Sequence, residues 1–199
     1  QKTASEGALR ASLAGIGFEA FLWQQNAVRE GEQRVRLKEV LELTDAALQG
    51  SDAKAMCAIL CHELRRRYAC ERVSIGLIKG ESIAVAGISV ADTVDTRSPA
   101  AETLRDAMEE CAIQDTEIFY PKPPESEHDP MTRRITIAHE RLSQKDGPSS
   151  ILSLPLRIEG DLVGVMVLER PSNDPFPPGA AALLRLVAEF IGSAVWTRR

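Results

Sequence analysis

The side chains best suited to chemistry in this sequence are one histidine and a pair of neighbouring cysteines. His139 carries an imidazole that can donate one hydrogen bond and accept another. Cys57 and Cys61 are four residues apart, which places both thiols on one face of a helix. A closed metal site needs about four ligands, and no CxxC pair or histidine follows at a suitable spacing. We therefore predict core thiols and no metal site.

Motifs, composition and charge narrow the class of protein. The sequence has no Ser/His/Asp constellation, P-loop or glycine-rich dinucleotide motif, so we predict that it is not an enzyme. Its net charge of −5, with 27% charged and 44% hydrophobic residues, is typical of a soluble globular domain. This charge disfavours nucleic acid as a partner, because nucleic acid binds clustered positive charge. No apolar run approaches the ~20 residues of a membrane-spanning helix, so we predict no direct membrane insertion.

The apolar pattern predicts helices at both ends and two hairpins between them. Helical spacing covers 5–26, 29–48, 52–68, 99–111, 132–142 and 179–196. Alternation predicts hairpins over 72–90 and 150–169, and a short strand over 116–120. Pro155 has no amide donor, so it marks an edge or bulge position. The stripe expected to be buried in the last helix is Ala182, Leu183, Leu186, Val187, Phe190, Ile191 and Val195.

Three segments occur in an informative order. They are Arg72–Gly80, Ser150–Leu156 and Gly160–Leu168, with Phe176 ahead of the final helix. Together they resemble a GAF domain, the small-molecule sensing module. The resemblance implies an α+β fold (an α/β sandwich) with a mostly antiparallel sheet of about five to six strands, and N- and C-terminal helices packed on one face. We predict a helical extension over 1–28 and the GAF domain over 29–199.

Shorter segments carry a closer resemblance. They are Arg72–Gly76, Tyr120-Pro121, Ala138–Glu140, Leu152–Leu156 and Leu168–Pro171. They resemble GAF domains fused ahead of HlyD-like membrane-fusion segments of efflux or secretion adaptors. We interpret the chain, from Gln1 to Arg199, as part of a longer, membrane-associated bacterial protein. Its four cysteines predict reduced thiols and a cytoplasmic domain.

The family's binding mode points to one face of the sheet. GAF domains usually bind ligands on one face and pack their terminal helices on the other. In the first strand, Ser74 and Gly76 share a small, polar face that suits a pocket. Ser153 is assigned to the same side, and Tyr120 is placed at the entrance, beside the proline-rich loop 121–130. The alternatives are that these residues fill space and that the loop is a plain surface loop.

His139 completes the predicted ligand site. The segment Ala138-His139 resembles the bilin-binding segment of phytochrome-type GAF domains, in which a Cys-His pair precedes the strand. Alanine stands at the cysteine position, so covalent bilin attachment there is disfavoured. His139 can still hydrogen-bond a ligand, or it can be a satisfied packing histidine. The predicted ligand-binding residues are Ser74, Gly76, Tyr120, His139 and Ser153, and the cofactor, if any, is unknown.

The function predicted from these observations is sensory. The domain binds or responds to a small molecule and signals through amphipathic terminal helices, Val35–Leu48 and Leu183–Val195, which form a homodimer. The alternatives are a ligand-free dimerisation or docking scaffold, and a GAF module of a sensor kinase or cyclase. A methionine-sulfoxide-reducing GAF enzyme is a further alternative, but its cysteine pattern does not map onto Cys111, which completes an apolar helical stripe.

Overall fold

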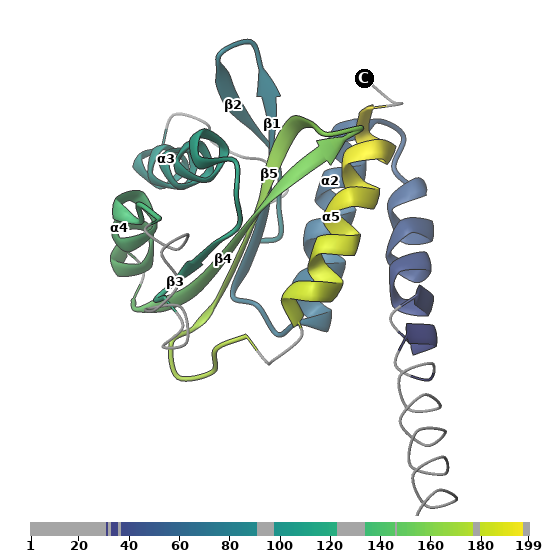
Figure 1. Cartoon of the computed structure of the whole chain (residues 1–199), viewed down its shortest axis with the longest axis horizontal. Helices are drawn as coiled ribbons and strands as arrows, with labels where there is room; N and C mark the ends of the chain where they lie inside the picture. The colour runs from purple at the N-terminus through teal and green to yellow at the C-terminus, as the bar shows by residue number, and fades with distance from the viewer. Residues whose placement is uncertain are drawn as a thin grey trace, which may run out of the picture. The chain divides into compact units, whose positions relative to one another are not determined.

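The sheet has five antiparallel strands in the order β2-β1-β5-β4-β3, with helices against both faces (Figure 1). This confirms the predicted α+β architecture. The structure is a computed structural model that describes residues 31, 33–35, 37–90, 98–122, 134–145, 147–176 and 180–196. Its elements are α2 (Ala53–Arg67), β1 (Arg72–Lys79), β2 (Ser82–Ile88), α3 (Pro99–Gln114), β3 (Ile118–Tyr120), α4 (Ile137–Lys145), β4 (Ser149–Ile158), β5 (Asp161–Pro171) and α5 (Ala180–Trp196).

The chain divides into two compact units, Gln1–Leu41 and Glu42–Arg199. The predicted domain boundary at residue 28 lies outside the described residues, as does the expected helix over 5–26, so both stay predictions. Within the described residues, 37–48 are helical, and Leu43 and Ala47 of this stretch are buried. None of the described helices combines the length and apolarity required to cross a membrane.

Local capping explains where α2 and α3 begin. The Asp52 carboxylate accepts a hydrogen bond from the Ala55 N–H at 2.8 Å, as the sequence predicts for an N-cap. Ser98 caps α3 in the same way, through a 3.2 Å bond from the Ala101 N–H, with Pro99 in the first helical turn. α3 ends at Asp115, whose φ of 50° is left-handed and stops the helix.

α4 begins at Ile137, five residues later than predicted. The side-chain amide of Gln114 accepts from the Ile135 N–H at 2.8 Å and donates to the Ile135 carbonyl at 2.9 Å. Both backbone groups of Ile135 are therefore engaged outside a helix. The apolar spacing of the sequence could not reveal this, because the partner side chain belongs to α3.

The two faces of the sheet are covered by different pairs of helices. α2 and α5 pack on one face, and α3 and α4 pack on the other (Figure 1). The N- and C-terminal helices of the fold therefore share a face, as predicted. On β4, the alternate residues Leu152, Leu154 and Leu156 are buried on the α2/α5 side, whereas Ile151 belongs to the core beneath α3 and α4.

The predicted buried stripe of α5 is wrong at two positions. Leu186 and Phe190 are 45% and 46% exposed, whereas Leu184 and Ala188 are buried. The helix approaches β4 so closely at Gly192 that a Cβ there would lie 2.2 Å from the Arg157 carbonyl oxygen. This close approach sets the rotation of α5 about its axis and turns Leu186 and Phe190 outward.

Candidate functional site

Several polar side chains lie on the face of the sheet that α3 and α4 cover. The position of Gly76 identifies which face of β1 this is. A Cβ built on Gly76 would lie 2.5 Å from Met108 Sδ on α3, so Gly76 faces α3. Ser74 is two residues earlier on the same strand and shares this face. Across the sheet Ser74 pairs with Val167, which in turn pairs with Ser153. The two serines therefore lie on one face, two strand spacings apart, or roughly 10 Å.

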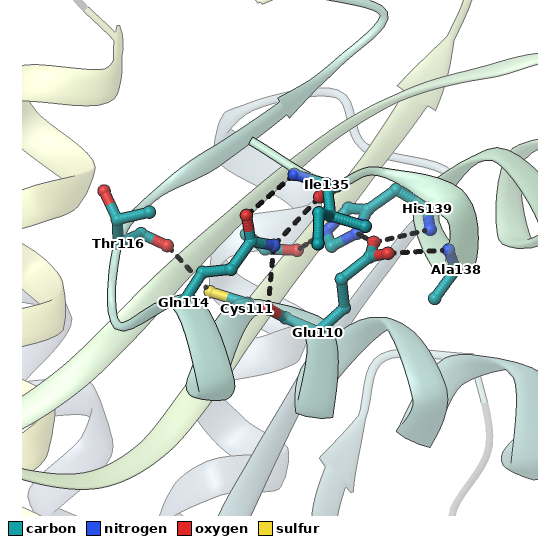
Figure 2. A network of polar contacts seen from close by, with 8 residues as sticks. Glu110, Cys111, Gln114, Thr116, Ile135, Ala138 and His139 are labelled. Carbon is teal, nitrogen blue, oxygen red and sulfur yellow. Dashed lines mark hydrogen bonds and ion pairs between the residues drawn. The ribbon is translucent and has the colours of Figure 1, made fainter. Parts of the chain in front are cut away.

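The centre of the site is a hydrogen-bonded chain through His139. Nδ1 of the imidazole is 2.6 Å from the Glu110 carboxylate, and Nε2 is 2.7 Å from Ser153 Oγ. The side chains come from α3, α4 and β4, and Figure 2 shows the approach of Glu110 to His139 and Ala138. His139 and Ser153 are both fully buried. The structure thus brings two of the five predicted residues into direct contact.

Glu110 does more than hold the imidazole. Its carboxylate also accepts hydrogen bonds from the Ala138 N–H at 3.0 Å and the His139 N–H at 3.2 Å. These are first-turn amides of α4, which have no partner inside the helix. A side chain on α3 therefore caps α4, and Gln114, one turn later on α3, holds Ile135 (Figure 2).

Electrostatics set the protonation state of this chain. Burial lowers the pKa of His139 from its usual 6.5, although Glu110 partly opposes the shift. Burial alone would raise the pKa of Glu110, but hydrogen bonds from the Ala138 N–H and from His139 lower it overall. At neutral pH Glu110 is therefore a carboxylate and His139 a neutral imidazole. Nδ1–H then donates to Glu110, and Nε2 accepts from the Ser153 hydroxyl.

This arrangement corrects the expectation that the chain has no Ser/His/acid constellation. The carboxylate contacts Nδ1 and the serine contacts Nε2, which is the order found in serine hydrolases. In a hydrolase, however, the serine must reach a substrate. Ser153 is completely buried in this structure, so the chain of contacts serves here to join α3, α4 and the sheet.

Ser74 and Gly76 lie on the predicted face, directly beneath side chains of α3 and β2. Ser74 is fully buried, and its hydroxyl has no hydrogen-bond partner among the described residues. The space over Gly76 is filled by the ends of the Met108 and Ile83 side chains. These belong to an apolar cluster that also includes Leu104, Cys111 and Val167.

Tyr120 lies at the edge of the same face. It pairs with Ile151 and packs, half-buried, against the apolar cluster. Burial raises its pKa, and Glu140 adds to the shift. Residues 123–130 of the adjoining loop lie outside the described residues, so its predicted role as an entrance stays a prediction.

The cysteines are buried thiols. Burial raises the pKa of Cys57 and of Cys111 to about 12, and raises that of Cys61 as well. All are therefore protonated at neutral pH, and a protonated thiol is a poor nucleophile and metal ligand. Across the ranges that the structure describes, no three His, Cys, Asp or Glu side chains are grouped so as to hold a metal ion.

The sequence matches the profile of the GAF domain over residues 52–195. The chain belongs to the GAF family. The match spans α2 to α5, and thus every described strand of the GAF sheet and the helices on both of its faces. No curated protein matches the chain in sequence.

Solved structures show the same fold at low sequence identity. The GAF domain of a phosphoenolpyruvate-protein phosphotransferase from Acinetobacter superposes with a TM-score of 0.57 at 10% identity, covering 82% of this chain and 93% of that one. Free methionine-R-sulfoxide reductase from Neisseria meningitidis, in complex with its substrate, gives 0.55 at 15% identity, covering 80% and 87%. The chromophore-binding domain of an R. palustris bacteriophytochrome gives 0.58 at 12% identity, covering 81% and 61%. These likenesses show the GAF fold alone.

Sequence reasoning missed Glu110, whose carboxylate contacts both the His139 side chain and the first-turn amides of α4. It comes three residues after the buried Ala107 and directly before the buried Cys111. An acid at the border of a buried helical stripe was a usable signal, since carboxylates are seldom buried without partners. Its partners could not be deduced, because they come from a helix 28 residues further along.

Proposed function

We propose that this GAF domain is a non-catalytic, cytoplasmic sensory module that binds a small molecule between the sheet and α3/α4. The observation that carries the proposal is the set of polar groups buried on this face: Glu110, His139, Ser153 and the unpartnered Ser74. Burying polar groups in a core costs free energy, and apolar residues would pack this face at lower cost. The net charge of −5 supports a small molecule rather than nucleic acid as the partner.

The proposed site must open before a ligand can bind. Met108 and Ile83 fill the space above Gly76. Met108 contributes the end of a flexible side chain, whereas Ile83 contributes a methyl group on its β-branch. Met108 has three rotatable bonds and can leave this position at modest cost. Its movement would expose the Ser74 hydroxyl, which gains a partner only from a ligand or water. We therefore propose a largely apolar ligand with at least one hydrogen-bonding atom near Ser74.

Native mass spectrometry of the protein purified from its own host tests ligand binding. We expect an excess mass that disappears on denaturation. Met108→Trp, which fills the site with a larger side chain, should reduce the fraction carrying the excess mass. The control Ile113→Trp changes an 84% exposed residue of the same helix and should leave that fraction unchanged. A clean ligand-free mass for the wild type, or equal occupancy in both variants, would overturn the proposal.

A second candidate function is a ligand-free dimerisation or docking scaffold. The observation that favours it is the filling of this face by its own side chains, with Ile151 fully buried and Tyr120 packed against the cluster. A scaffold needs no opening of the site. The same mass measurement separates the two functions, because a scaffold predicts only the ligand-free mass.

We also propose that the domain forms a homodimer through its terminal helices. Support comes from the apolar residues that α5 leaves exposed, Leu186 and Phe190, and from Leu48 at 47% exposure. Sedimentation velocity should show a dimer that Phe190→Glu converts to monomer. Ile113→Glu, a change of the same kind at an exposed position on α3, should leave the dimer intact. A wild-type monomer at high concentration would contradict this.

The parent protein is a separate proposal, supported by sequence resemblance alone. We propose a membrane-associated bacterial protein in which this domain precedes an HlyD-like segment, with a sensor kinase or cyclase as the alternative. Sequencing the parent gene past the codon for Arg199 tests it. An HlyD-like segment there would support the proposal, and a kinase or cyclase domain would overturn it.

A further inference from the structure

A pocket of about 280 Å³ lies at the outer edge of β4 and contains none of the residues discussed so far as ligand-binding. β3 pairs with β4 only from Ile151 to Ser153, and Pro155 beyond it has no N–H to offer another strand. The charged residues that line the space are Asp115, Glu117, Arg134, Arg157, Arg185 and Glu189. They come from the α3–β3 connection, the segment before α4, the end of β4, and α5.

Two of the three arginines are matched by carboxylates. Arg185 donates from Nε and Nη2 to the two carboxylate oxygens of Glu117, at 2.6 Å and 2.8 Å. Arg157 pairs with the Asp115 carboxylate and also donates to the Gly160 carbonyl at 2.9 Å. The forked pair of Arg185 and the single contact of Arg157 engage both carboxylates of the α3–β3 connection.

Arg134 has no carboxylate partner among the described residues. Its guanidinium donates to the backbone carbonyl of Glu117, and its Nε is buried with no hydrogen-bond partner among the described residues. No ion pair joins Arg134 to any carboxylate of the described ranges. A buried donor on a charged group is costly when it is unsatisfied. Among the described residues that line the pocket, the remaining carboxylate is Glu189, which is exposed on α5.

We propose that this pocket binds an oxyanion, the phosphate or carboxylate group of a small molecule, on the guanidinium of Arg134. A guanidinium presents its N–H donors in a planar fork that matches both groups. Asp115 and Glu117 neutralise Arg157 and Arg185, so the unpaired charge comes from Arg134. The exposed Glu189 opposes it and keeps the affinity moderate. The size suits a small anion, since it is near the lower end of typical ligand pockets. The bound anion contacts both α5 and the segment that enters α4.

Titration of the full chain with inorganic phosphate or acetate tests the site, with sodium chloride holding the ionic strength constant. The readout is the Nε–Hε resonance of Arg134 in ¹H–¹⁵N spectra. We expect a saturable shift. Saturation by phosphate alone identifies the phosphate form of the proposal, and saturation by acetate identifies the carboxylate form. The absence of a saturable shift with either anion would overturn it.

Four variants, followed through the backbone amides of residues 115–117 and 185–189, make the test specific. Arg134→Gln should abolish saturation, and Arg134→Lys, which keeps the charge without the fork, should weaken binding. Glu189→Gln removes the opposing charge and should tighten binding by about two- to tenfold. The control Arg66→Gln alters an arginine that is 70% exposed on α2 and should change nothing. Unchanged affinity in a folded Arg134→Gln protein would overturn the proposal.

Discussion

The two faces of the sheet differ in the polarity of their buried side chains. Beneath α2 and α5 the strands present buried apolar residues in alternation, such as Leu152, Leu154 and Leu156 on β4. Beneath α3 and α4 the same strands carry Ser74 and Ser153. The first face is held by apolar burial, which is strong and non-directional. The second combines an apolar cluster around Met108 with directional contacts through Glu110 and His139. Because Met108 is flexible, we expect this face to rearrange more readily than the first.

The largest effect is expected on the apolar face. Leu60 on α2 is 1% exposed, and Leu60→Ala should lower the free energy of unfolding by about 2–5 kcal/mol through lost burial and a residual cavity. Urea denaturation measures this. The control Leu186→Ala, at a 45% exposed position on α5, should cost less than about 0.5 kcal/mol. If both variants lowered the free energy of unfolding equally, burial of apolar side chains on this face would not be what stabilises the fold.

Removal of the Glu110 charge should have the next largest effect. Glu110→Gln keeps the shape, but its amide nitrogen meets the N–H donors of Ala138 and His139. The expected loss is about 1–3 kcal/mol by urea denaturation, with α4 less protected from hydrogen exchange. Glu102→Gln, an exposed change in the first turn of α3, serves as the control. Unaltered exchange in α4 would show that Glu110 does not cap it.

The polar face should also make stability depend on pH. The pKa of His139 is lowered in the folded state, so the unfolded chain takes up a proton first as the pH falls through about 6.5. Stability is therefore complete above pH 6.5 and declines below it, until the folded-state pKa is reached. The slope is at most about 1.4 kcal/mol per pH unit for one proton.

His139→Gln should remove this decline, whereas His62→Gln, at an exposed position of α2, should retain it. Urea denaturation from pH 5 to 8 gives the comparison. The depressed pKa of Glu110 adds a second loss at lower pH, below its unfolded value of 4.5. A wild-type stability that is flat between pH 5 and 7 would contradict the assignment of a neutral, buried imidazole.

The smallest expected effect is a difference in stability between alanine variants of Ser153 and Ser74. Ser153→Ala breaks a buried hydrogen bond to His139 and should cost about 1–2 kcal/mol. Ser74→Ala removes a hydroxyl that has no partner in the described structure, and should be neutral or stabilising by up to about 1 kcal/mol. Thermal denaturation of the two matched variants tests this. A comparable loss from Ser74→Ala would show that its hydroxyl already has a partner.

Local pattern predicted much of the fold. Alternation located β1, β4 and β5 to within one or two residues, and Asp52 was correctly expected to begin α2. The start of α4 was misplaced because Gln114 and Glu110 hold the preceding backbone from another helix. The exposed residues of α5 were misassigned because the contact at Gly192 fixes its rotation. Both errors come from contacts distant in sequence.

The sequence by itself determined the elements, the faces of the strands and the family, because these follow from periodicity and from short segments in a set order. It also placed Ser74, Gly76 and Ser153 on one side, since successive residues in a strand alternate. Only the tertiary structure decided that Glu110 meets His139, that Met108 fills the space over Gly76, and that the Arg134 Nε has no partner among the described residues. Such contacts join residues far apart in the chain, and their geometry depends on how helices pack on a sheet.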